Sequence, residues 1–234
     1  MIRFEAAAGS VVGTRYRANF DVAHLAVDPL VAVVADGMGD GEGSTRAGRA
    51  AVDAFVGLVT ADPTPRLLLD AVATAQGAVA EVARQVPGLA GCTLTALVES
   101  GEDLWISQIG DSRVYRLRSG LLELLTVDHT MAWLGAVHGW YAFESPQAAA
   151  ARYHLTRYVG HPAKPEPDVV HVSPRAGDVY LLCTDGVAEQ VPYTLLLETL
   201  GKSITQQAKV DALLTAADAA GGRDNATAIV VECR

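Results

Sequence analysis

The sequence predicts an α+β fold in which helices pack outside antiparallel sheets. Its strand-like and helix-like segments come in blocks: one strand, two helices, a long run of strands, further helices and a last strand. This order differs from the steady strand–helix alternation that is typical of parallel sheets. Within the run of strands the connections are short and contain Gly, as in hairpins.

The first half of the chain contains one clear strand and two helices. Residues 30–35 form an uninterrupted apolar run and predict a buried strand. Alanine and larger apolar residues follow at helical spacing, so we expect a helix that begins with Ser44 as its N-cap. The DPTP sequence at 62–65 separates it from a second helix, marked by apolar residues from 68 to 82.

The second half contains most of the strands. We expect strands within 92–100, 103–112, 113–120, 121–127, 169–172, 179–183 and 226–233. We expect helices at 147–158, 193–200 and 206–220. The irregular segment 128–160, which holds the first of these helices, has the composition of an insertion, and 161–167 is a loop.

Composition narrows the functional classes. Half of the 234 residues are apolar, and no run is long enough for a transmembrane helix. Without a signal peptide at the N-terminus, the sequence suggests a soluble, cytoplasmic protein. A formal net charge of −9 argues against nucleic acid as a partner. The three cysteines, Cys92, Cys183 and Cys233, lie in strand-like contexts and are expected to be buried thiols.

Four aspartates beside small residues adjoin apolar runs. Asp36, Asp111 and Asp185 each follow such a run, and Asp224 precedes one. A single aspartate of this kind is often only a turn residue. Four at strand ends suggest carboxylates that converge on one sheet edge, where their repulsion calls for a cation. Oxygen ligands favour Mg²⁺ or Mn²⁺ over zinc.

The glycine-rich stretch after residue 35, DGMGDGEGS, matches none of the common loops. An EF-hand that begins at Asp36 needs an acid or Asn where Met38 stands and Glu where Ala47 stands. The GK[ST] of a P-loop and the last glycine of GxGxxG are also missing.

The ordered set of motifs resembles the bacterial protein phosphatase 2C (PPM) family of metal-dependent Ser/Thr phosphatases. The matching pieces are VVADGMG, GCTLTALV, ISQIGDSRVYRL, DHT, LTRYVG, GDVYLLCTDGV and GGRDNATAIVV. They come in family order and span nearly the whole chain. The resemblance implies a four-layer αββα sandwich with two central antiparallel sheets, formed as one domain by residues 1–234, with a small flap at roughly 128–160.

The resemblance also implies a binuclear Mn²⁺ or Mg²⁺ centre. By similarity Asp36 bridges two ions, the Gly37 carbonyl binds one of them, and Asp185 and Asp224 bind the other. Asp111 helps to hold a third, looser ion, or is only a turn residue that caps its hairpin. The expected reaction is in-line attack of a metal-bridging hydroxide on phosphoserine or phosphothreonine.

The N-terminal stretch RYRANFD departs from the family pattern. Asp21 matches an aspartate that can hold metal-bound water, but Phe20 replaces the usual Glu or Gln. The family's phosphate-binding Arg is out of register, because its usual spacing falls on Tyr16. Arg17 is the favoured replacement and Arg15 the other, and a solvated basic turn is the alternative for both.

The resemblance leaves three functions open. The first is a phosphatase of phosphorylated proteins, substrates of a Ser/Thr kinase, acting as a monomer without nucleic acid or membrane partners. Phe20 motivates a second, a pseudophosphatase that serves as a binding module. The third is a phosphatase that acts on an anti-sigma-factor antagonist.

Overall fold

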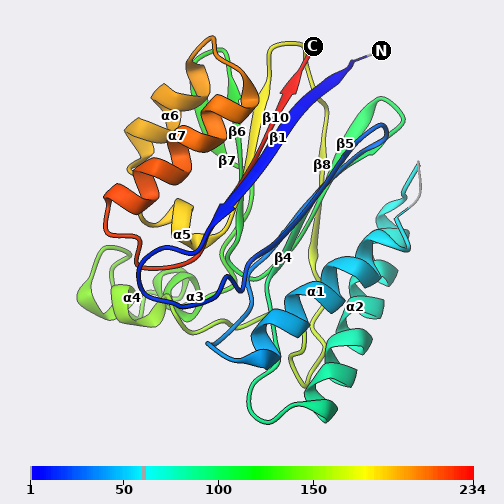
Figure 1. Ribbon diagram of the computed structural model, residues 1–234, viewed down its shortest axis with the longest axis vertical. Coiled ribbons are helices and arrows are strands. Elements are labelled where there is room, and N and C mark those ends of the chain that lie inside the picture. The colour runs from blue at the N-terminus through cyan, green and yellow to red at the C-terminus, as the bar shows by residue number, and fades with distance from the viewer. Residues whose placement is uncertain (1, 60–61) are drawn as a thin grey trace.

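Two stacked antiparallel sheets with helices on both outer faces form the body of the molecule (Figure 1). The computed structural model describes residues 2–59 and 62–234. One sheet has the order β1 (Phe4–Val11), β10 (Ala226–Cys233), β9 (Val179–Cys183), β6 (Arg113–Arg118), β7 (Leu121–Leu124). The other has the order β2 (Val22–Val27), β3 (Leu30–Ala35), β4 (Leu94–Ser100), β5 (Asp103–Ile109), β8 (Asp168–Val172). The predicted αββα sandwich is confirmed.

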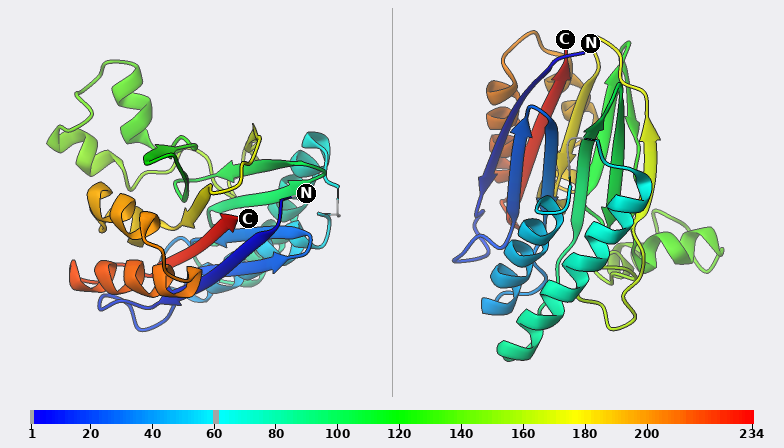
Figure 2. Two further views of the ribbon diagram at one scale, coloured as in Figure 1. Left: turned by 90° about the horizontal axis from the view of Figure 1, so that it is seen from above. Right: turned by 90° about the vertical axis from the view of Figure 1, so that its right-hand side faces the viewer.

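The helices are divided between the two outer faces. Helices α1 (Glu42–Val56) and α2 (Pro65–Gln85) cover the β2–β8 sheet, and α6 (Tyr193–Gly201) and α7 (Gln206–Ala219) cover the other. Three short helices complete the fold: α3 (Met131–Val137), α4 (Pro146–Ala151) and α5 (Asp185–Ala188). Figure 2 shows α3 and α4 projecting from the body. No helix in the described part of the chain is long and apolar enough to cross a membrane.

The uninterrupted apolar run of β3 follows from burial on both of its faces. Leu30, Ala32 and Val34 point into the layer between the two sheets. The residues that alternate with them, Val31 and Val33 among them, pack against α1 and α2. Since successive side chains of a strand point to opposite faces, a strand enclosed in this way has no solvent face. Its end is therefore held in a fixed place.

Two helix starts differ in how well the sequence predicted them. The expectation that Ser44 caps the first helix is wrong: α1 begins two residues earlier, after Gly41, and no side chain caps it. The Ser44 hydroxyl instead donates a hydrogen bond of 2.5 Å to the Met38 carbonyl. Helix α2 begins within the proline-rich segment 62–65 that precedes it. Thr64 is its N-cap and accepts a hydrogen bond from the amide of Leu67.

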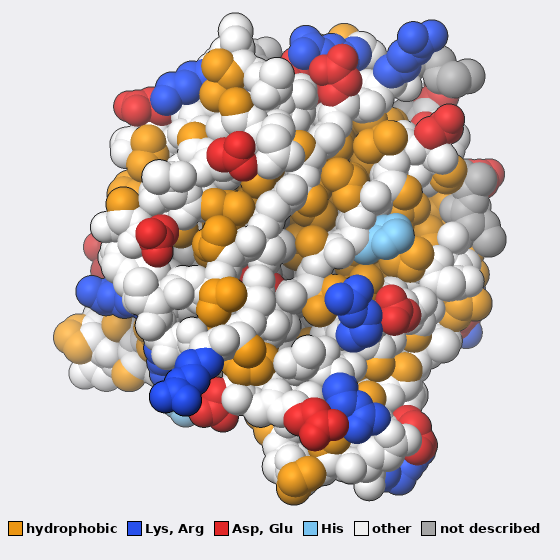
Figure 3. Space-filling model, viewed as in Figure 1, with side chains coloured by type: hydrophobic (Ala, Val, Ile, Leu, Met, Phe, Trp, Pro, Cys, Tyr) orange, Lys and Arg blue, Asp and Glu red, His pale blue; other side chains and the backbone are white. Residues whose placement is uncertain are grey.

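The remaining differences lie in weakly patterned segments. Strands β1 and β2 were not expected, because their alanines, glycine and histidine lack a strong strand signal. These edge strands lie side by side, and Figure 3 shows hydrophobic side chains on the face above them. The helix expected at 147–158 covers only 146–151, and α5, a single turn after β9, was not expected.

Substitution of a residue between the sheets should destabilise the whole sandwich. Leu97 is fully buried in that layer, so Leu97→Ala should lower the free energy of unfolding by about 2–5 kcal/mol. Urea unfolding followed by circular dichroism measures the loss. The control Leu121→Ala, at a side chain that is 59% exposed, should change it by less than about 0.5 kcal/mol. Equal losses would contradict this assignment of the core.

Candidate functional site

Five aspartates from separate strands meet at one edge of the sandwich. Asp36 follows β3 and Asp21 precedes β2; these strands are antiparallel partners, so the two residues lie at the same end. Asp111 follows β5, Asp185 follows β9, and Asp224 precedes β10. Four of the five line a pocket of about 590 Å³, and Asp21 lies buried beside it. The structure thus brings together the aspartates that the sequence singled out.

Asp21 is held by two hydroxyl groups from the other sheet. Its Oδ2 accepts hydrogen bonds from Thr184 Oγ1 at 2.8 Å and Thr227 Oγ1 at 2.7 Å. Its Oδ1 is buried and has no hydrogen-bond partner within the described residues. Burial is the main reason that the pKa of Asp21 rises to about 6. This carboxylate joins the two sheets and keeps one oxygen available.

The other carboxylates are crowded by burial and by one another. Burial and then the negative charge of Asp185 raise the pKa of Asp36 well above its usual range. Burial and then Asp111 do the same to the pKa of Asp185. Burial, followed by Asp128 and Glu189, raises the pKa of Asp111 to about 7. One oxygen of Asp185 is buried and, in residues 2–59 and 62–234, accepts no hydrogen bond.

These groups fit a hydrated divalent cation. The unpaired oxygens of Asp21 and Asp185 are hard ligands, and a cation would relieve the repulsion that raises the pKa values. Within the described residues no three His, Cys, Asp or Glu side chains are close enough to form a ready-made metal cage. Mg²⁺ commonly keeps several waters and uses only one or two carboxylates, so this spacing suits an ion of that kind.

The backbone after β3 is fixed on both sides of Asp36. Its amide donates to Thr93 Oγ1, and its carbonyl accepts from the amide of Thr93, both at 2.9 Å. A Cβ at Gly37 would lie 2.6 Å from the carbonyl oxygen of Ser44 and 2.8 Å from that of Phe20. Close packing therefore already requires glycine here, apart from any role of its carbonyl. Gly39 has φ +96°, a left-handed conformation that glycine adopts without strain.

Asn225 connects the loop before β2 to the start of β10. Its Nδ2 donates to the carbonyl oxygens of Val12 at 2.7 Å and Ala18 at 3.1 Å, and its Oδ1 accepts from the amide of Phe20 at 2.7 Å. Sequence reasoning did not single this residue out. The only available signal was its place directly after Asp224, where an asparagine reads as a turn residue.

The two candidate arginines differ in their access to the aspartates. Arg15 lines both the aspartate pocket and a neighbouring cavity of about 440 Å³, whereas Arg17 lines only the neighbouring cavity. Burial raises the pKa of Asp224, and the positive charge of Arg15 opposes that rise. The buried ring of Phe20 packs edge-on against Tyr16 at 5.7 Å and belongs to the walls of both cavities. Arg15, not the favoured Arg17, is therefore the basic residue at the aspartates.

The segment 128–160 is attached to the body close to Asp111. The imidazole Nδ1 of His129 accepts from the amide of Gly110, so its Nε2 carries the hydrogen that faces Asp168 at 3.1 Å. Arg152 pairs with Glu189 at 3.2 Å. Tyr153, from the same segment, lies at the wall of the aspartate pocket. Part of the segment 128–160 thus borders the aspartate pocket.

Comparisons with known proteins agree with this geometry. The family model described as protein phosphatase 2C matches residues 18–217. The chain is 32% identical to the serine/threonine phosphatase stp of Listeria monocytogenes over 218 residues, 87% of this chain and 84% of that protein. It is 35% identical to the serine/threonine protein phosphatase PstP of Mycobacterium tuberculosis over 226 residues, which are 92% of this chain but only 42% of PstP.

Two solved structures share the whole architecture. The catalytic domain of PstP in complex with two manganese ions superposes with a TM-score of 0.87 at 30% identity, covering 100% of this chain and 99% of that one. The PPM Ser-Thr phosphatase MsPP from Mycobacterium smegmatis, in complex with cacodylate, has a TM-score of 0.85 at 30% identity, covering 97% of each chain.

The aspartate cluster should make the metal-free protein less stable as pH rises. The folded state keeps protons on Asp21 and Asp111 up to about pH 6 and 7, whereas the unfolded chain has released them by about pH 5. The free energy of unfolding in EDTA should therefore fall between about pH 5 and pH 7.5.

Urea unfolding at both pH values measures this slope, and Asp111→Asn should make it shallower. His129 acts in the opposite direction, because burial lowers its pKa and its contribution is lost as pH falls below about 6.5. Stability of the metal-free protein that is level or rises over this interval would show that the carboxylates do not repel one another as inferred.

Proposed function

Because the chain belongs to the protein phosphatase 2C family, we propose that it is a metal-dependent phosphatase that hydrolyses phosphoserine and phosphothreonine in proteins. The observation that carries this proposal is the pair of buried, unpaired carboxylate oxygens on Asp21 and Asp185 at the edge where the two sheets meet. Buried carboxylate oxygens without hydrogen-bond donors are rare in folded proteins, and a bound cation would satisfy both.

The proposed cofactors are two Mn²⁺ or Mg²⁺ ions, with a third held more loosely. Asp36, the carbonyl of Gly37, Asp185 and Asp224 would hold the first two, and Asp111 the third. Such ions, when bound, lower the pKa of a coordinated water and offset charge on a phosphoryl group. Asp21 lies beside these residues, and the hydroxyl groups of Thr184 and Thr227 hold its Oδ2 in place.

The protein's own side chains supply binding and orientation. The guanidinium of Arg15 is the positive group of this chain at the pocket wall, placed to pair with phosphoryl oxygens. The buried ring of Phe20 closes the wall beside it and keeps solvent from that side. Met38 lines the pocket but carries no titratable proton, so it cannot protonate the serine or threonine oxygen that leaves.

Phe20 also favours a second candidate, a pseudophosphatase that binds phosphoproteins without hydrolysing them. An aromatic ring at this wall provides no oxygen to hold metal-bound water. Calorimetric titration with Mn²⁺ separates the candidates: the enzyme should show tight binding that disappears in Asp36→Ala and Asp185→Ala, and a binding module should show none. We further propose that the chain is one phosphatase domain, acts as a cytoplasmic monomer, and opposes a Ser/Thr kinase.

Loss of a metal ligand should abolish hydrolysis. We expect the Mn²⁺-loaded protein to release phosphate from a phosphothreonine peptide, and Asp185→Asn to lower kcat at least about 100-fold. A phosphate-release assay with and without EDTA measures both. The control is Asp53→Asn on the exposed face of α1, which should retain full activity. No release by the wild-type protein at any Mn²⁺ concentration would refute the enzyme.

A matched pair of arginine variants tests which side chain binds phosphate. Arg15→Ala should raise KM for the phosphopeptide about 10-fold or more, the value of a charge-assisted hydrogen bond. Arg17→Ala, which faces the neighbouring cavity, should change KM less than about twofold by the same comparison. Steady-state kinetics decides, and the reverse order would restore the assignment to Arg17.

A further inference from the structure

A second cavity, of about 520 Å³, lies at the end of the sandwich away from the aspartates. Residues 202–205, which connect α6 and α7, form one wall, and β6, β9 and β10 form another. Strands β9 and β10 run from one site to the other: Val179 and Glu232 pair at this cavity, whereas Cys183 and Ala228 pair near Asp185. The cavity is therefore separate from the candidate metal centre.

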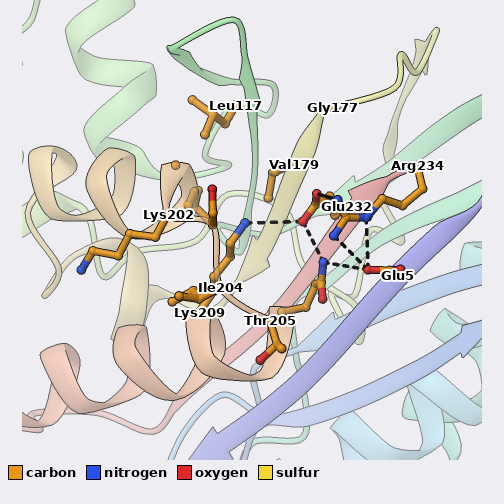
Figure 4. A pocket seen from close by; sticks show the side chains of 14 residues that line it. Glu5, Leu117, Gly177, Val179, Lys202, Ile204, Thr205, Lys209, Glu232 and Arg234 are labelled. Atoms are coloured by element: carbon orange, nitrogen blue, oxygen red, sulfur yellow. Dashed lines mark hydrogen bonds and ion pairs between the residues drawn. The ribbon is translucent and has the colours of Figure 1, made fainter.

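Lys209 is the unusual residue of this cavity. It belongs to the first turns of α7 and is only 2% exposed, yet it lines the cavity. Its amine points toward Glu232, whose nearest oxygen is 3.6 Å away (Figure 4). Among residues 2–59 and 62–234 the amine donates no hydrogen bond within 3.5 Å. The amine forms an ion pair with Glu232 that is longer than a hydrogen bond, so an acceptor from outside the chain that came within hydrogen-bond distance would stabilise it.

The neighbouring carboxylates are already satisfied by other donors. Glu232 Oε2 accepts from Gln206 Nε2 at 2.7 Å, and Glu232 Oε1 pairs with Arg234 Nη1 at 2.8 Å. Glu5 Oε2 accepts from Arg234 Nε at 3.2 Å. Figure 4 shows these contacts as one closed group, with Lys209 at its margin. Apart from its ion pair with Glu232, the amine of Lys209 is available to donate to a ligand.

The charge and the walls of the cavity define the ligand. Three cations and two carboxylates line it, which leaves one net positive charge: Lys202, Lys209, Arg234, Glu5 and Glu232. This balance suits a monoanion, whereas a phosphate dianion would meet the two carboxylates with excess charge. Leu117, Val179 and Leu200 provide an apolar wall. The volume is in the range of small-molecule sites.

We propose that this cavity binds a monocarboxylate with an apolar body, whose carboxylate accepts hydrogen bonds from Lys209 while its hydrocarbon part contacts Leu117, Val179 and Leu200. The same chemistry occurs in a free small acid and in the C-terminal residue of a peptide. The site goes beyond the proposed phosphatase activity and uses none of its residues.

The probes are hexanoate, its neutral amide hexanamide, and the capped dipeptide N-acetyl-alanyl-leucine. Binding to the full chain loaded with Mn²⁺ is measured by saturation-transfer NMR and calorimetry. We expect hexanoate or the dipeptide to bind with Kd near about 1 mM, and hexanamide at least about 10-fold more weakly, because it lacks the charge. The carboxylate that binds more tightly shows whether the site prefers a free small acid or the C-terminal residue of a peptide.

Variants locate the binding and separate it from the metal centre. Lys209→Met should weaken binding at least about 10-fold, whereas the control Lys164→Met, at an exposed lysine outside the cavity lining, should bind the probe as the wild type does. Leu117→Trp, which fills the cavity and leaves its charges in place, should also abolish binding and serves if Lys209→Met does not fold.

Asp36→Asn should bind the probe as the wild type does, whether or not the protein is a phosphatase. Absence of binding at about 10 mM, or binding unchanged in both Lys209→Met and Leu117→Trp, would overturn the proposal.

Discussion

Electrostatic repulsion among aspartates is the constraint on which the rest of this structure depends. Asp36 and Asp185 come from different sheets; besides burial, the charge of Asp185 raises the pKa of Asp36, and the charges of Asp111 and Asp224 raise the pKa of Asp185. Such crowding is unfavourable in a chain without a cation, so the sandwich must hold the carboxylates in place against it. The fully buried β3, the hydroxyl pair on Asp21 and the paired contacts of Thr93 all act at this edge. The fold therefore keeps the carboxylates close together despite their repulsion, which a bound metal ion would reduce.

The local sequence predicted those elements whose residue pattern is compatible with only one kind of secondary structure. The apolar run 30–35, for example, predicted a buried strand, and the structure has this strand with the same bounds. The four acidic turns could be located because each adjoins such a strand. Their convergence followed from antiparallel pairing, which places alternate strand ends at one edge. The family resemblance supplied the number of layers, which periodicity alone did not provide.

The sequence did not predict features that depend on distant contacts. Ser44 looks like a cap, but its hydroxyl is used by the Met38 carbonyl, a contact that no local pattern encodes. Spacing pointed to Tyr16 and could not decide between Arg15 and Arg17, because the conformation of their loop depends on Asn225 far along the chain. The sequence also did not predict Lys209 and its cavity, because the lining residues come from six separate elements and from the loop between α6 and α7.

The pairing of β1 with β10 has a consequence for the making of the protein. These strands come from opposite ends of the described chain, and Asn225, at the start of β10, fixes the loop that carries Arg15. On the ribosome, a nascent chain that already holds Asp21 and Asp36 still lacks Asp224, Asn225 and the Thr227 hydroxyl that positions Asp21. The pocket is therefore assembled last. A partly synthesised chain that lacks β10 therefore has no complete site.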